Sequence, residues 1–178
     1  EHGIKTDGHT VYLEEKQVMD ALESVPKQFT ILARNPDRNV TVGDRKPVFA
    51  PGYGAPFLVD YEVGKRAPTM EDYHNLVKLA HALPNQDMSG HLIVEPQGVS
   101  TPHLAMLHAH MVHSDKAFIG STEGAVGARH TMEMAAILFG EDTVRENAVT
   151  INLINSLTPL GYSDESLGAL MEYARRRQ

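Results

Sequence analysis

The chain has 178 residues, which is enough for one sizeable domain or a large part of one. Hydrophobic residues make up 42% and charged residues 22%, close to an average globular protein, so a disordered chain is not expected. A net charge of −7 disfavours binding to nucleic acid through a broad basic face, and the absence of cysteine excludes disulfides, thiolate metal sites and a cysteine nucleophile.

The apolar segments are short. The longest, such as Leu92–Val94 and Ala135–Phe139, fall far below the roughly 20 residues that span a bilayer. No signal peptide is visible, so a soluble, cytoplasmic protein that does not act at a membrane is expected. Because the first residue is Glu1 rather than methionine, we expect the natural N-terminus to lie upstream.

The first third of the chain predicts one helix followed by short strands. Leu13–Val25 has apolar residues at helical spacing and ends at Pro26. Four β-prone runs follow, separated by turn residues: 29–33, 39–42, 48–50 and 56–59. We therefore interpret residues 1–54 as an N-terminal extension rich in hairpins.

From Pro68 onward, β-prone runs alternate with capped helical segments. Helices are predicted to begin at Thr69, at Thr101-Pro102, at Thr122-Glu123 and at Ser163, and strands are predicted at His91–Glu95, Lys116–Gly120 and Val149–Leu153. This alternation is typical of βα units with parallel strands, so residues 55–178 are predicted to form an α/β fold, about half of a (β/α)8 TIM barrel. Whether Pro56–Asp60 adds a fourth barrel strand is left open, and an open doubly wound sheet is the structural alternative.

Polar residues that directly follow the predicted strands are the candidates for a functional site, because parallel α/β folds carry their sites at that edge. Glu95 and Glu123 are the catalytic candidates, since a carboxylate there can orient a ligand or hold a proton. Tyr61, Thr122 and Asn155 are candidates for substrate binding. For Glu123 a simpler explanation exists, because an acidic residue in a first helical turn stabilises the helix dipole.

Ten histidines raise the possibility of a metal site, because four of them lie in one predicted helix: His103, His108, His110 and His113. The helical spacing places His108 on the apolar face and the others on a polar outer face, and no His-Glu-x-x-His motif is present. We therefore expect no metal bound by this chain. A metal-dependent barrel hydrolase that uses His103, His110 and His113 remains the alternative function.

The glycine-rich stretch Gly120–Gly127 lies between a predicted strand and a predicted helix, where a phosphate-binding loop would lie. Its spacing fits neither G-x-G-x-x-G nor G-x-x-x-x-G-K-[ST]. Close packing of a helix on a sheet explains these small residues equally well, so binding of a nucleotide or of S-adenosylmethionine is disfavoured.

One long segment carries a family resemblance. The stretch 57–87, reading FLVDYEVGKRAPTMEDYHNLVKLAHALPNQD, resembles the trimethylamine methyltransferase family, and the likeness extends through 29–36, 52–54, 94–96 and 155–160. The resemblance implies a (β/α)8 barrel with an N-terminal extension, and a parent chain much longer than this section. No single motif in these segments is as specific as a zinc-binding motif, so the resemblance depends on all the matching segments taken together.

The resemblance also implies a reaction, in which a methyl group passes from a methylated amine of the trimethylamine or glycine betaine type to a Co(I) corrinoid. That corrinoid (cobalamin) is carried by a cognate partner protein. Tyr61, Glu95, Glu123 and Asn155 are then expected to hold the cationic amine. Arg66 is the candidate for a betaine carboxylate.

The alternative to an enzymatic function is that this section of a barrel is catalytically inactive by itself. A half-barrel lacks part of its site and exposes sheet edges, so pairing in a homo-oligomer is expected.

Overall fold

The computed structural model describes residues 3–176 apart from positions 44, 92 and 159, and within them the chain is an α/β protein. Its strands are β1 (Lys5–Asp7), β2 (Thr10–Tyr12), β3 (Phe29–Ile31), β4 (Val40–Val42), β5 (Leu58–Asp60), β6 (Gly64–Arg66), β7 (Met88–Ser89), β8 (Ala117–Ile119) and β9 (Thr150–Ile151). Its helices are α1 (Glu15–Glu23), the 3-10 helix η1 (Pro36–Arg38), α2 (Met70–Ala82), α3 (Pro102–His113), α4 (Gly124–Phe139), α5 (Glu141–Glu146) and α6 (Asp164–Arg175). No helix in this described part has the length and apolar character needed to cross a bilayer.

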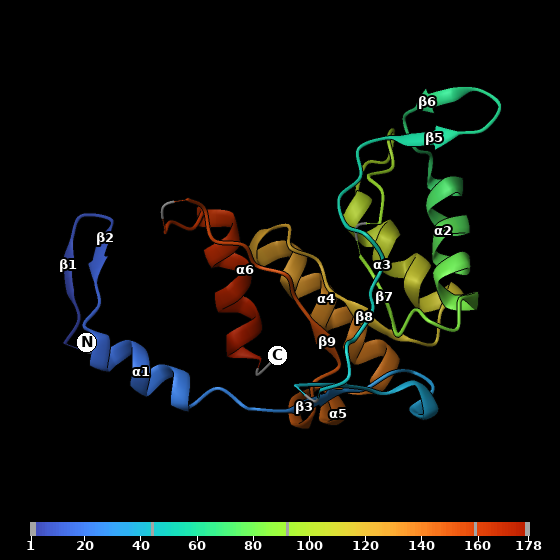
Figure 1. Ribbon diagram of the computed structural model, residues 1–178. Coiled ribbons are helices and arrows are strands. Elements are labelled where there is room, and N and C mark those ends of the chain that lie inside the picture. The colour runs from blue at the N-terminus through green and yellow to red at the C-terminus, as the bar shows by residue number, and fades with distance from the viewer. Residues whose placement is uncertain (1–2, 44, 92, 159, 177–178) are drawn as a thin grey trace.

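A parallel sheet in the order β7-β8-β9 organises the fold. Met88 pairs with Ala117, and Phe118 pairs with Thr150. Helix α3 connects the first two strands, α4 and α5 connect the second pair, and α6 follows β9, with α4 and α6 lying side by side (Figure 1). Because each helix runs back against its strand, the carboxyl ends of the strands and the amino ends of α3, α4 and α6 share one edge.

Alternating residues of β8 divide the core into two layers. Phe118 packs with Leu107, Met132 and Tyr173 between the sheet and the helices. Ala117 and Ile119 face the other way and pack with residues of β3, β4 and β7. A third cluster joins α2 and α3 around Tyr73, Val77 and Met106. Helices therefore cover one face of the sheet, and residues of the β3–β4 hairpin pack against side chains of the other face.

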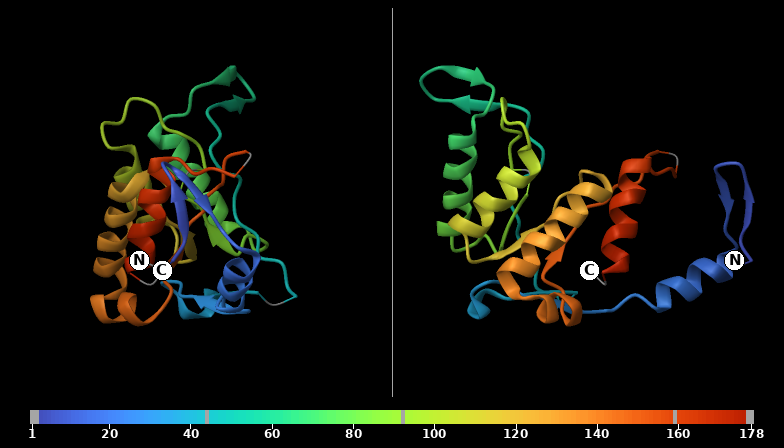
Figure 2. Two further views of the ribbon diagram at one scale, coloured as in Figure 1. Left: turned by 90° about the vertical axis from the view of Figure 1, so that its left-hand side faces the viewer. Right: turned by 180° about the vertical axis from the view of Figure 1, so that it is seen from behind.

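The antiparallel hairpins occupy three different places. The β3–β4 hairpin lies at the amino ends of the parallel strands, where the Leu32 amide donates to the Ala148 carbonyl at 2.8 Å. The β5–β6 hairpin stands at the opposite end, beside the start of α2 (Figure 1). The β1–β2 hairpin and α1 extend away from the rest of the chain (Figure 2), and α1 contains no buried residue.

The four helices predicted after residue 68 are confirmed, and side-chain caps begin two of them, α2 and α6. Thr69 accepts from the Asp72 amide while the Asp72 carboxylate accepts from the Thr69 amide, which is a capping box. Ser163 caps α6 through the Ser166 amide. Helix α4 ends at Gly140, whose φ of +88° is a conformation that favours glycine. The α1 helix and the β3–β4 pair are also confirmed within the predicted ranges.

Two strand predictions are wrong and one open choice is settled. The strand expected at His91–Glu95 is found at Met88–Ser89, and 48–50 forms no strand. Residues 56–60 contribute β5 to an antiparallel hairpin rather than to the parallel sheet. The helix α5 was not predicted. The first error arose because the apolar run ending at Val94 outweighed the shorter segment before it, although only the shorter segment pairs with β8.

Gly120 is required by close packing, because a Cβ there would lie 2.5 Å from the Tyr173 hydroxyl and 2.8 Å from Thr131 Cγ2. We expect Gly120→Ala to lower the free energy of unfolding by about 1–3 kcal/mol, the usual cost of overpacking a core. Urea denaturation measures this change, with Gly52→Ala as the control because nothing lies within 4 Å of its added Cβ. Equal effects of the two substitutions would contradict the packing role of Gly120.

Candidate functional site

The carboxyl ends of the three parallel strands bring together residues far apart in the sequence. His91 follows β7, Thr122 and Glu123 follow β8, and Asn152 follows β9. The Ser121 carbonyl ties this edge together, since it accepts from Asn152 Nδ2 at 2.8 Å and from the Tyr173 hydroxyl at 2.9 Å. The strand ends therefore form one fixed cluster.

Glu123 is the central charged group of the cluster. Its Oε1 lies 3.7 Å from Nε2 of His91, and its Oε2 lies 3.4 Å from Nδ1 of His103. Contact with His91 is the main cause that lowers the pKa of Glu123, with a further contribution from His103, and partial burial opposes both. The side chain is 38% exposed, so it presents a carboxylate to the solvent side of the cluster.

A pair of histidine rings extends the cluster along α3 and α4. His103 Nε2 and His130 Nδ1 are 2.9 Å apart, and the two rings are stacked with centroids 5.1 Å apart. Burial lowers the pKa of His103, and Glu123 opposes this change. His103 contacts both Glu123 and His130, so these three side chains form a continuous polar chain.

Tyr53 contributes an aromatic ring from the N-terminal third of the chain. Its hydroxyl lies 3.4 Å from the hydroxyl of Thr122, and the ring is half-buried. Burial raises the pKa of Tyr53, and the nearby charge of Glu123 acts in the same direction. A tyrosine ring and a carboxylate at one strand end are groups that attract an organic cation.

A buried hydrogen-bond network holds the backbone behind the cluster. The Tyr73 hydroxyl donates to the His91 carbonyl, so it must accept from His110 Nε2 at 2.8 Å. His110 Nδ1 lies 2.6 Å from the Ser89 hydroxyl, which then donates to it. These partners assign the neutral Nε2–H tautomer to His110. Burial is the main cause that lowers its pKa to about 3, which keeps the ring neutral at physiological pH.

The structure brings together two of the predicted site residues and separates the others from them. Thr122 and Glu123 lie in the strand-end cluster. Glu95 is exposed, and its described contacts are made by its backbone with Ala55 and Gln97. Tyr61 is fully exposed at the tip of the β5–β6 hairpin, and Asn155 is exposed in the loop after β9.

Arg66, the candidate for a substrate carboxylate, is already occupied by two acidic side chains. Its guanidinium donates to both oxygens of Asp72 at 2.6 and 2.8 Å and to Asp60 at 3.1 Å. These pairs raise the pKa of Arg66, and hydrogen bonds from Arg66 are the main cause that lowers the pKa of Asp72. The pKa of Asp60 is lowered mainly by the hydrogen bond from the Glu62 amide, with Arg66 as the second cause. Arg66 thus joins the β5–β6 hairpin to the start of α2, and its guanidinium donors are used in the hydrogen bonds that make this connection.

The predicted arrangement of histidines along α3 is wrong. His108 is exposed and His110 is buried, because the hydroxyls of Tyr73 and Ser89 accommodate the His110 ring in the core. His103 contacts His130, whereas His113 packs against His74. These histidines therefore point to three different places. Within the described ranges, no three His, Asp or Glu side chains are grouped so that they could hold a metal ion.

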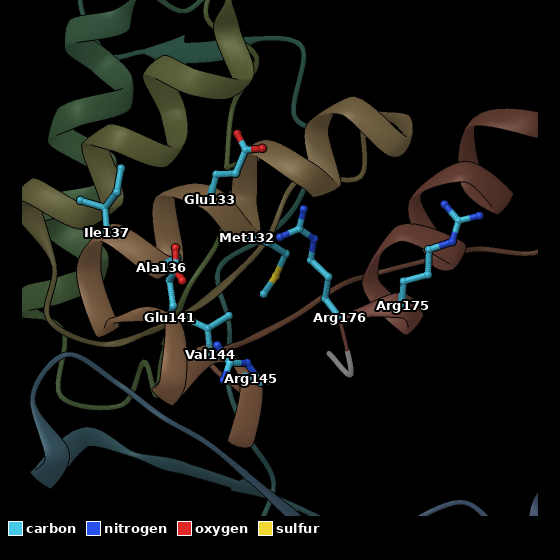
Figure 3. Close-up of a pocket in the computed structure, with 9 residues that line it drawn as sticks. All are labelled: Met132, Glu133, Ala136, Ile137, Glu141, Val144, Arg145, Arg175 and Arg176. Atoms are coloured by element: carbon cyan, nitrogen blue, oxygen red, sulfur yellow. The ribbon is translucent and has the colours of Figure 1, made fainter.

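One groove lies away from the strand ends, on the outer helical layer. It has a volume of about 670 Å³ and is formed by α4, α5 and the end of α6. Arg176 reaches from α6 toward Met132 of α4 in Figure 3. Arg145 and Arg176 are paired with Asp142 and Glu172, at 3.1 Å each. The groove is near the carboxyl ends of the helices, at the opposite edge from the Glu123 cluster.

Sequence reasoning missed three members of the cluster: His91, His130 and Asn152. His91 was placed inside a strand, which hid its position directly after β7. The available signal was the polar Ser89-Gly90-His91 step that follows Met88, which resembles the Gly120-Ser121-Thr122 step after β8. The contact of Tyr53 with Thr122 likewise leaves no local pattern in the sequence.

Comparison with known proteins matches residues 1–178 to the family described as trimethylamine methyltransferase (MTTB). A glycine betaine methyltransferase of Desulfitobacterium hafniense (strain Y51) is 46% identical over 99% of this chain and 37% of its own length. An L-carnitine:corrinoid methyltransferase of Eubacterium limosum is 26% identical, over 100% of this chain and 38% of its own length. The trimethylamine methyltransferase MttB of D. hafniense (strain DSM 10664 / DCB-2) is 27% identical, over 98% of this chain and 36% of its own length. The chain thus spans little more than a third of these relatives.

Proposed function

Because the chain belongs to the trimethylamine methyltransferase family, we propose that the protein containing it transfers a methyl group from a methylated amine to a Co(I) corrinoid carried by a partner protein. A quaternary amine of the glycine betaine type is the leading substrate. The identity of 46% to a glycine betaine methyltransferase, against 26% and 27% to the other two relatives, supports this choice. The L-carnitine:corrinoid relative supports the choice of acceptor.

The observation that carries the proposal is the half-exposed Glu123 carboxylate beside Tyr53 at the ends of the parallel strands. A quaternary ammonium has no N–H to donate, so a protein recognises it by negative charge and by aromatic faces. Glu123 supplies the charge and Tyr53 supplies a ring. Thr122 fixes that ring through its hydroxyl.

The proposed reaction needs orientation more than acid catalysis. The corrinoid supplies a Co(I) nucleophile that attacks the methyl carbon, and the electron pair of the broken C–N bond stays on nitrogen. The leaving group is a neutral tertiary amine, so it requires no general acid. This chain would hold the cation against Glu123, exclude water and direct one methyl group outward.

We also propose that the three βα units belong to a (β/α)8 barrel, with residues 1–54 as an extension and 55–178 as part of the barrel. The sequential order β7-β8-β9 with all strands parallel supports this arrangement. Glu95, Tyr61 and Asn155 remain proposed contributors to the substrate site. All three are exposed, so they are accessible to the rest of the barrel or to the partner protein.

The test is a methyl-transfer assay with the whole protein that carries this chain and its Co(I) corrinoid protein. With glycine betaine we expect release of dimethylglycine together with loss of the Co(I) absorbance. With trimethylamine at the same concentration we expect a rate at least about tenfold lower, equivalent to about 1.4 kcal/mol in transition-state stabilisation. No consumption of Co(I) with any methylated amine would refute the proposed function.

A further inference from the structure

His91 is a buried side chain whose hydrogen-bonding capacity is unused. The residue is 0% exposed, and neither ring nitrogen has a hydrogen-bond partner among the described residues. A neutral imidazole carries one N–H in either tautomer, and an imidazolium carries two. Every protonation state therefore leaves at least one buried donor without an acceptor at hydrogen-bond distance, which is a destabilising arrangement.

The position of this donor is fixed by the core. The Tyr73 hydroxyl donates to the His91 carbonyl, and Tyr73 is in turn held by His110. On its other side, Nε2 of His91 lies 3.7 Å from the Glu123 carboxylate, which is beyond hydrogen-bond distance. A rigid donor without a partner at hydrogen-bond distance thus lies next to the half-exposed carboxylate that the proposed function assigns to the substrate cation.

We propose that His91 donates a hydrogen bond to the carboxylate of a zwitterionic substrate whose ammonium group lies against Glu123. This inference rests on the proposed function and deepens it, because it identifies the substrate class as an ammonium carboxylate rather than a simple methylamine. A glycine betaine molecule carries both groups, and its carboxylate supplies the acceptor that the His91 ring lacks. Tetramethylammonium and protonated trimethylamine carry no acceptor and leave the ring without a hydrogen-bond partner.

The short separation of the two protein groups also restricts the ligand. Because His91 and Glu123 are 3.7 Å apart, the ammonium and carboxylate of the ligand must be neighbours, as they are when one carbon joins them. Because the His91 ring is fully buried, the proposed binding requires the Glu123 side chain to move with the ammonium group, so that Nε2 opens to the carboxylate. The donors of Arg66 are already bound to Asp60 and Asp72, so Arg66 does not compete for this role.

The experiment compares two ligands on the whole protein that carries this chain. Titration calorimetry gives Kd for glycine betaine and for tetramethylammonium, with wild type, His91→Met and His91→Gln. We expect His91→Met to weaken glycine betaine about 10- to 100-fold and tetramethylammonium less than about twofold, and we expect the amide donor of His91→Gln to restore part of the loss. His108→Met is the control, because His108 is exposed on the same α3 helix.

Equal weakening of both ligands, or no change in either, would overturn the role of His91 while leaving the proposed function intact. Failure of the wild type to bind both ligands would remove the proposed function and the inference together. If His91→Met does not fold, ¹⁵N spectra of histidine-labelled wild-type protein decide the question. Glycine betaine should then shift one buried imidazole signal that tetramethylammonium does not shift, and the same response to both ligands would refute the proposal.

Discussion

Replacement of Glu123 by Gln should raise KM for glycine betaine about 10- to 100-fold, with kcat unchanged or somewhat raised. The carboxylate is the charged group at the strand-end edge, where it already faces His91 and His103. Its attraction is strongest for the intact cation and weakens as positive charge leaves the nitrogen in the transition state. The loss therefore falls on substrate binding rather than on the chemical step.

The measurement is steady-state kinetics of methyl transfer with the whole protein and its corrinoid partner. Glu133→Gln makes the same change of charge on the exposed side of α4, beside the outer groove, and should leave KM unchanged. The same substitution at Glu95 is also expected to reduce transfer, with a smaller effect than at Glu123 because Glu95 is exposed. A fall in kcat with constant KM would show that Glu123 acts in the transition state and not on the bound cation.

Replacement of His110 by Gln should change how stability depends on pH. In the folded protein the pKa of His110 is about 3, against 6.5 for a free histidine, so below pH 6.5 the unfolded chain binds a proton that the folded protein does not. This histidine therefore contributes stability above pH 6.5, which is lost as pH falls toward 3. The slope is at most roughly 1.4 kcal/mol per pH unit.

At pH 7.5 we expect His110→Gln to lower the free energy of unfolding by about 1–3 kcal/mol, because the Ser89 and Tyr73 hydroxyls lose a matched partner. As pH falls to 4, the wild type should lose about 3 kcal/mol of stability relative to the variant, so the difference between them vanishes or changes sign. Urea denaturation at a series of pH values measures this difference, and other titrating groups cancel in it. His108→Gln is the control on the same helix, and a difference for His110→Gln that stays constant with pH would contradict the assignment.

The sequence by itself determined the elements whose signals are local. Thr69 and Ser163 cap helices through atoms three residues away, and Gly140 ends α4 because its own backbone is left-handed. The alternation of strands and helices predicted the α/β class, and the residues directly after β8 supplied Thr122 and Glu123. These features are readable from sequence because a few adjacent residues decide them.

Tertiary structure decided which segments pair and which polar groups enter the core. The strand before α3 is Met88–Ser89 because it pairs with β8, although Leu92–Val94 is the more apolar run in the sequence. His110 rather than His108 is buried, since only His110 meets the hydroxyls of Ser89 and Tyr73. His91 and Tyr53 reach the Glu123 cluster from separate parts of the chain, and contacts across such separations leave no local pattern. Pairing and burial depend on the partner that the fold supplies, which is why the site emerged only once the strands were placed side by side.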